Sequence, residues 1–202
     1  MKKKSALLIV DVQNDFCPNG SLAIPEGDSI IPVLNKYIKI FSSGTLPLFA
    51  SRDWHPKKTT HFNAFGGLWP AHCVQESHGA RFHPVLRLPE SAIILSKGMD
   101  PETDSYSAFQ AVDAKGNDFA QRLKTFSIKE LFVGGLATDY CVRWTVLDAL
   151  KFGLRVFLLM DAIKGVNLRE NDSEASVEEM VRLGAKKITI EKLSRMFAGE
   201  RK

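Results

Sequence analysis

Hydrophobic and polar positions alternate between two patterns along the chain. Short continuous apolar runs such as Ala6–Val10 are typical of strands buried on both faces. Between them, segments such as Ile30–Phe41 place apolar residues at helical spacing, with Pro32 in the first turn, where proline is tolerated. The predicted strands are Ala6–Val10, Leu46–Ser51, Ala92–Leu95, Leu131–Val133, Val156–Met160 and Ile188–Ile190. The predicted helices are Ile30–Phe41, one near Asp118–Thr125, Asp139–Phe152 and Ser173–Leu183.

This order of elements predicts the fold class. Strands that alternate with helices indicate right-handed crossovers and a parallel sheet. We therefore expect an α/β fold, a three-layer α/β/α arrangement with a six-stranded, mostly parallel sheet. The 202 residues contain no internal repeat or low-complexity linker, which suits a single domain over residues 1–202. Residues 52–91 show no steady period and predict a long structured loop within that domain.

Composition and charge narrow the classes of protein. With 45% hydrophobic and 25% charged residues the chain is not a disordered one, and no apolar run approaches the roughly 20 residues that cross a bilayer. The net charge of +4 owes much to lysines and arginines at the two ends, which we expect to be solvated. No basic stripe is interleaved with aromatic residues, so neither nucleic acid nor a membrane is expected as a partner. Asp11 follows the first apolar run too soon for a signal peptide, which favours a cytoplasmic location.

Cysteine usage points to free thiols. Cys17, Cys73 and Cys141 are an odd number at wide spacings, so they form no disulfide framework. Cys141 falls in the opening turn of a predicted helix, whose partly positive end lowers the pKa of a thiol. Gly134 and Gly135 just upstream would let the backbone turn tightly and expose amide N–H groups as an oxyanion hole. For Cys17 and Cys73 we expect only packing near the pocket, the usual role of a free cysteine.

Chemically useful side chains follow the predicted strands. Ligands of an open parallel sheet bind outside the carboxyl ends of its strands. Asp11 follows the first strand, Lys97 the third and Cys141 the fourth, so these residues should face one edge. Asp11 has an alternative role as a turn cap, and Lys97 as a solvated charge. Together with Cys141 they match a base, a cationic stabiliser and a nucleophile.

The long loop carries a second group of residues. Asp53 and His55 are followed by His61 and His72, a set of carboxylate and imidazole ligands that suits Zn²⁺, Fe²⁺ or Mn²⁺. The alternative is an aromatic-rich lid with surface histidines. His78 and His83 lie in a polar stretch, and we expect both at the surface.

Four segments of the chain resemble the nicotinamidase/pyrazinamidase family, within the isochorismatase-like cysteine hydrolases. They occur in the family's order between about Leu7 and Val166. The segments are LLIVDVQNDFCPNGSL, which ends at Leu22, SRDWHPKKTTH at Ser51–His61, WPAHCV at Trp69–Val74, and LFVGGLATDYCV at Leu131–Val142.

The resemblance implies a role for each matching position. The family triad falls on Asp11, Lys97 and Cys141. The metal ligands fall on Asp53, His55 and His72, with His61 matching a fourth ligand found in only some members. Phe16 and Trp69 match the aromatic residues that sandwich the substrate ring. The family's cis peptide falls between Leu136 and Ala137, and the N–H groups of Ala137 and Cys141 match the oxyanion hole.

The resemblance also implies the reaction. Nicotinamide is converted to nicotinate and ammonia in NAD salvage, through a thioester on Cys141, with pyrazinamide as a further substrate. The implied cofactor is one divalent transition metal ion, Zn²⁺ first, with Fe²⁺ or Mn²⁺ as alternatives, and it orients the substrate. Members of the fold often self-associate, so a homo-oligomer is one expectation.

Three alternatives are weighed against this reading. An isochorismatase-type hydrolase works without the nucleophilic cysteine, so Cys141 argues against it. Amidohydrolases of carbamoyl or ureido substrates typically lack the metal ligands, so Asp53, His55 and His72 argue against them. A non-catalytic metal- or ligand-binding protein on the same fold is disfavoured because no group needed for turnover is missing.

Overall fold

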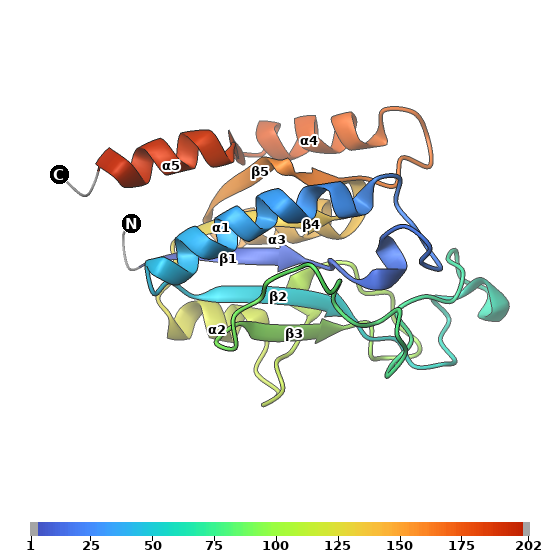
Figure 1. The fold of residues 1–202 in the computed structure, drawn as a ribbon. Helices are drawn as coiled ribbons and strands as arrows, with labels where there is room; N and C mark the ends of the chain where they lie inside the picture. The colour runs from blue at the N-terminus through green and yellow to red at the C-terminus, as the bar shows by residue number, and fades with distance from the viewer. Residues whose placement is uncertain (1–3, 200–202) are drawn as a thin grey trace.

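The computed structural model describes residues 4–199, and its centre is a six-stranded sheet (Figure 1). The strands are β1 (Ser5–Val10), β2 (Leu48–Asp53), β3 (Ile93–Lys97), β4 (Glu130–Leu136), β5 (Arg155–Lys164) and β6 (Lys186–Ile188). They lie in the order β3-β2-β1-β4-β5-β6, and every neighbouring pair is parallel. The prediction of a six-stranded α/β sheet is confirmed.

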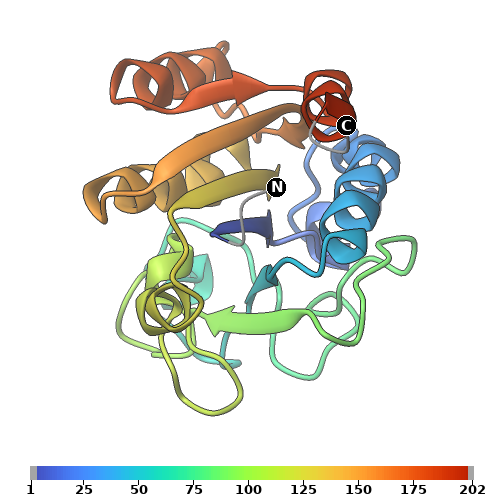
Figure 2. The same cartoon turned by 90° about the vertical axis from the view of Figure 1, so that its left-hand side faces the viewer.

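Helices cover both faces of the sheet, which gives the three predicted layers. One face packs against α1 (Ile31–Ser43) and α5 (Ile190–Gly199), and the other against α2 (Phe119–Thr125), α3 (Arg143–Lys151) and α4 (Asp172–Arg182). Figure 2 shows the two helical layers on opposite sides of the strands. Strand β1 contributes to both cores: Leu7 and Ile9 face the α1 side, whereas Leu8 and Val10 face the α3 side. Successive side chains of a strand point to opposite faces of the sheet. Because both faces are covered by helices here, apolar residues occupy the positions on both faces and the strand appears in the sequence as a continuous apolar run.

Strands β2, β3 and β4 end later than predicted, and this moves several candidate residues. Asp53 and Lys97 are the last residues of β2 and β3 rather than the residues after them. Gly134 and Gly135 lie inside β4, so the prediction that they form the turn before Cys141 is wrong. The physical reason is the close approach of β1: a Cβ on Gly135 would lie 2.1 Å from the carbonyl oxygen of Val10. The predicted helix over Asp139–Phe152 begins as a π-helical turn, Thr138–Val142, before α3.

The C-terminal region departs most from the sequence prediction. Strand β6 ends at Ile188, and Ile190 begins α5, a helix that the sequence pattern did not predict. Asp161 on β5 explains this start. Its carboxylate accepts hydrogen bonds from the Tyr37 hydroxyl (2.8 Å) and from the amide of Ile190 (2.9 Å). A helix leaves its first amides unpaired, and here a side chain distant in the sequence satisfies one of them.

Outside the sheet, the long loop is confirmed. Residues 54–92 contain no strand or α-helix, only the short 3₁₀ turn Asn63–Phe65. At the basic ends, Lys4 is exposed as expected, and Lys2, Lys3, Arg201 and Lys202 lie outside the described residues. Among the helices of residues 4–199, none has the length and apolar character to cross a membrane.

The strand order places a binding crevice at one edge of the sheet. β1 and β4 lie side by side at the middle of the sheet. β2 and β3 follow β1 toward one edge, and β5 and β6 follow β4 toward the other edge. Ligands of such sheets bind at the carboxyl ends of the strands where this reversal occurs. The crevice therefore lies where β1 and β4 end, at Asp11 and Ala137.

Candidate active site

The ends of β1 and β3 and the turn after β4 bring the three predicted catalytic side chains together. The Lys97 ammonium nitrogen lies 2.9 Å from Asp11 Oδ2 and 3.4 Å from Cys141 Sγ. It also contacts Asp53 Oδ1 at the end of β2, a contact that the sequence did not predict. All four residues are buried. The structure thus assembles a cysteine sulfur, two carboxylates and an ammonium around one point.

Mutual contact determines the charges of this group. Burial alone would lower the pKa of Lys97, but the Asp11 and Asp53 carboxylates raise it well above its ordinary value, so the ammonium keeps its proton. Burial raises the pKa of Asp11, although Lys97 and a hydrogen bond from the Ser51 hydroxyl (2.7 Å) oppose the effect. Burial would also raise the pKa of Asp53, but Lys97, His55 and His72 together outweigh it and hold that pKa well below its usual range.

The expectation of a lowered thiol pKa at Cys141 is wrong for the free protein. Burial raises the pKa of Cys141 well above its ordinary value, and the neighbouring Lys97 only partly opposes this. Asp11 and Asp53 add to the rise, because two carboxylates beside the sulfur disfavour a thiolate. The resting sulfur is therefore a thiol, and it needs a base to become a nucleophile.

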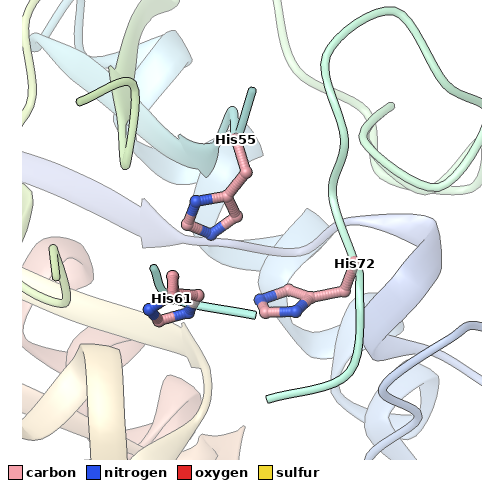
Figure 3. Close-up of side chains that lie close together, drawn as sticks. All are labelled: His55, His61 and His72. Carbon is pink, nitrogen blue, oxygen red and sulfur yellow. The ribbon is translucent and has the colours of Figure 1, made fainter. Parts of the chain in front are cut away.

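The three histidines of the long loop converge on one point. Figure 3 shows His55, His61 and His72 turned toward one another, and each offers a ring nitrogen within 4.8 Å of the others'. All three are buried, and the Nε2 atom of His55 has no hydrogen-bond partner among residues 4–199. Asp53 Oδ2 lies 3.8 Å from His55 Nε2 and 3.9 Å from His72 Nε2.

This donor set fits a divalent metal ion. Burial lowers the pKa of His72 to about 4 and that of His61 below its ordinary value, so both imidazoles are neutral donors near pH 7. Three imidazoles and one carboxylate are ligands that transition metals accept. His61, which the sequence left as an optional member of the set, lies among the other histidines.

A cavity connects the two groups of residues. Its lining includes Phe16, Trp69 and Ala137, together with Cys141 and His72. As the resemblance implied, the peptide bond between Leu136 and Ala137 is cis. The cavity therefore holds aromatic side chains, the cysteine and the histidine centre within reach of a single small molecule.

Several residues of the site were missed in the sequence. Tyr106 and Tyr140 line the cavity, and the Tyr106 hydroxyl accepts a hydrogen bond from Trp69 Nε1 (3.0 Å). The Gln13 side chain donates to the carbonyl of Asp53 and accepts from its amide (both 2.8 Å), which fixes the end of β2. Gln13 lies two residues after Asp11, just beyond the end of the first strand. Only this position in the sequence could have indicated that Gln13 belongs to the site.

Cys17, Cys73 and His78 occupy the kinds of position predicted for them, whereas His83 is less exposed than predicted. Cys17 and Cys73 are buried in the core on the α1 side. All three cysteines are free thiols. His78 is exposed and His83 is half-buried, and neither belongs to the histidine centre.

Comparisons with known proteins agree with this geometry. The Isochorismatase domain family matches residues 5–192. The chain is 42% identical to the nicotinamidase of Escherichia coli (strain K12), over 92% of this chain and 94% of that protein. It superposes on the pyrazinamidase of Pyrococcus horikoshii in complex with zinc, with a TM-score of 0.85, 45% identity, and coverage of 92% of this chain and 99% of that one. A protein from L. infantum in complex with nicotinate superposes with a TM-score of 0.80 at 33% identity, over 94% of each chain.

Proposed function

The chain belongs to the isochorismatase domain family, in its nicotinamidase/pyrazinamidase group, and we propose that it hydrolyses nicotinamide to nicotinate and ammonia. The observation that carries the proposal is a single cavity shared by Cys141 and a buried three-histidine centre. A cysteine hydrolase of other small amides needs the first feature but has no use for the second.

The chemical steps follow from the protonation states. Asp11, whose raised pKa makes it a stronger base than an exposed aspartate, takes the proton of the Cys141 thiol. Lys97 stays protonated and stabilises the thiolate from 3.4 Å. The sulfur adds to the carboxamide carbon, and the carbonyl oxygen becomes an oxyanion that the N–H groups of Ala137 and Cys141 stabilise.

The intermediate then breaks down in two halves. Asp11 returns its proton to the amide nitrogen, the C–N bond breaks, and ammonia leaves a thioester on Cys141. Asp11 next removes a proton from a water molecule, which attacks the thioester. Nicotinate leaves, and the sulfur regains a proton, so the enzyme is restored.

The residues proposed to hold the metal are Asp53, His55 and His72, together with His61. Zn²⁺ is the metal we propose, supported by the donor set and by the zinc in the related pyrazinamidase. When bound, the ion supplies a Lewis-acidic position that accepts the pyridine nitrogen of the substrate. Asp53 joins the two halves of the site, since one of its oxygens contacts Lys97 and the other faces the histidines.

The cavity walls explain the choice of a flat aromatic substrate. Phe16 and Trp69 offer ring faces and edges to a planar heterocycle, and Leu22 and Val166 complete an apolar lining. Pyrazinamide, which has the same shape and a ring nitrogen at the same place, is proposed as a second substrate. The proposal includes a cytoplasmic role in returning nicotinamide to NAD synthesis.

The experiment that tests the proposal measures ammonia release from nicotinamide, with and without a chelator. Wild-type protein should release ammonia, lose the activity on chelation and regain it with Zn²⁺. Cys141→Ala should lower kcat by about 1000-fold or more while leaving the metal content unchanged. Cys17→Ala, which removes a buried thiol outside the cavity, is the matched control and should keep the activity.

Two results would contradict the proposal. If Cys141→Ala kept substantial activity, the nucleophile would be a metal-bound hydroxide and the cysteine mechanism would be wrong. If the metal-loaded wild type released no ammonia from nicotinamide, the substrate would be another small amide.

A further inference from the structure

A short segment after β3, Gly98–Ser105, lies against the histidine centre. The carbonyl of Gly98 faces Nδ1 of His55 at 3.0 Å. Asp104 Oδ1 lies 2.5 Å from Nδ1 of His61. Nδ1 of His72 faces the carbonyl of Pro70 at 2.8 Å. Each Nδ1 therefore meets an oxygen acceptor and donates its hydrogen to it, which leaves the Nε2 atoms as the nitrogens that can bind a metal ion.

Asp104 differs from the other two acceptors. It is a carboxylate, whereas the acceptors of His55 and His72 are backbone carbonyls. A charged acceptor strengthens the hydrogen bond and makes the imidazole more basic. Among the three histidines, only His61 has a side-chain carboxylate as its Nδ1 acceptor. Asp104 should therefore strengthen the Nε2 of His61 as a metal ligand.

The backbone at Asp104 is held by contacts that do not involve His61. The side-chain nitrogen of Gln110 donates to the carbonyl of Asp104 (3.2 Å). The side-chain oxygen of Gln110 accepts from the amides of Tyr106 (3.0 Å) and Ser107 (3.1 Å). The Thr59 and Thr60 hydroxyls both donate to the carbonyl of Pro101 (3.0 Å), which ties the segment to the chain just before His61. The carboxylate is therefore presented to His61 by a fixed backbone.

The ring of His61 also has a defined plane. It stacks on His55 with ring centroids 4.6 Å apart and planes 18° apart (Figure 3). A half-turn of a ring in this plane would exchange Nε2 for a carbon at the metal centre. An acceptor at Nδ1 favours one of the two orientations, and the acceptor at His61 is Asp104.

We propose that Asp104 is a positioning residue of the metal centre, which holds His61 as a ligand and raises the affinity of the site for Zn²⁺. The inference rests on the metal site of the proposed function. It adds a residue that touches neither the substrate nor the reacting atoms and acts only through His61.

The test is the dissociation constant for Zn²⁺, measured by competition with a chromophoric chelator. Asp104→Ala should weaken binding by about 10–100-fold, the range found when an outer-shell partner of a metal-bound histidine is removed. Asp104→Asn, which keeps the shape and a neutral acceptor, should give a smaller loss. Glu102→Ala is the matched control, because it removes the same charge from an exposed side chain two residues earlier that has no hydrogen bond or ion pair in the described part of the chain. Its affinity should equal that of the wild type.

Two further readouts separate positioning from a general structural effect. In a His61→Ala background, adding Asp104→Ala should cause no further loss of affinity. The visible spectrum of Co²⁺ bound to Asp104→Ala should shift toward the spectrum of Co²⁺ bound to His61→Ala. Equal Zn²⁺ affinity in Asp104→Ala and the wild type would overturn the inference, as would an undiminished loss in the His61→Ala background.

Ammonia release from nicotinamide distinguishes failure of this inference from failure of the proposed function. An affinity that depends on Asp104 in a protein without amidase activity would refute the proposed substrate and support the inference. Amidase activity in a protein whose Zn²⁺ affinity does not depend on Asp104 would support the proposed function and refute the inference.

Discussion

At the scale of single residues, the site depends on one buried lysine. Lys97 is fully buried and touches two carboxylates and a thiol. A buried ammonium is costly unless it is paired, and removing one partner leaves an uncompensated charge. Asp11 and Asp53 provide that pairing. Asp11 is also the proposed base for Cys141, and Asp53 also faces the histidines. The catalytic and metal-binding groups are therefore one electrostatic unit.

Gly98 provides a prediction at this scale. Its φ is +67°, and a Cβ there would lie 2.4 Å from the His55 ring. Gly98→Ala should displace that ring and weaken Zn²⁺ binding by about 10-fold or more, because the ligand loses its orientation. Chelator competition measures the affinity.

Gly116→Ala is the control for backbone strain. Gly116 has a similar φ of +78°, but a Cβ there would meet nothing within 4 Å. Both substitutions cost about 1–2 kcal/mol of stability from the left-handed backbone, whereas only Gly98→Ala should affect the metal. An equal effect of the two variants on metal affinity would show that strain alone is responsible.

At the scale of elements, two neighbouring strands and the segments that follow them define the crevice. β1 and β4 pair in parallel register along their length, so Asp11 and the turn that leads to Cys141 leave the sheet at the same edge. α5 has a different role. It packs beside α1 at the other end of the molecule, toward the start of the strands (Figure 1). Catalytic geometry and the docking of α5 should therefore be separable.

Leu193 tests that separation. Its side chain is fully buried in the core that α5 shares with α1. Leu193→Ala should lower the free energy of unfolding by about 2–5 kcal/mol, from lost burial and the cavity left behind. Urea titration measures this change, and kcat/KM for nicotinamide should not change.

Met196→Ala is the matched control on the same helix. Met196 is 46% exposed, so its truncation should change the unfolding free energy by less than about 0.5 kcal/mol. A comparably small effect at Leu193 would mean that α5 does not dock on α1 in solution.

At the scale of the whole molecule, the proposed metal centre gathers distant parts of the chain. Its proposed ligands come from the end of β2, from the loop at His61 and from the loop at His72, and Asp104 reaches it from beyond β3. Residues 54–92 lack regular secondary structure other than one short turn, so few backbone ladders hold this loop. An ion that binds only the folded state should stabilise such a loop and the protein with it.

Chelation should therefore lower the unfolding temperature. At a free Zn²⁺ concentration about 100 times Kd, binding contributes about 2.7 kcal/mol. For a chain of this length that corresponds to a shift of about 5–10 °C. Differential scanning calorimetry of the stripped and reloaded protein measures it. In His55→Ala the reloading step should give no shift, and a full shift there would assign the stabilising ion to another site.

Sequence predictions agree with the structure where local residues determine an element, and fail where contacts between residues distant in the sequence determine it. The apolar run before Asp11 predicted β1 correctly, because a strand that is buried on both faces consists of consecutive apolar residues. The start of α5 at Ile190 was missed because it depends on Asp161, 29 residues away. The glycine pair was misplaced because the need for Gly135 arises from the backbone of β1, not from a turn.

The sequence by itself determined the α/β class and predicted which strand ends carry the chemically useful side chains. Strand and helix periodicities are local, and the carboxyl ends of parallel strands must meet at one edge, so Asp11, Lys97 and Cys141 were expected together. Only the tertiary structure decided the protonation of these groups, because burial and the distances among Lys97, Asp53 and Cys141 set their pKa values. It likewise decided that His61 joins the histidine centre and that Asp104 meets it. Both are contacts between loops, and loop contacts leave no period in the sequence.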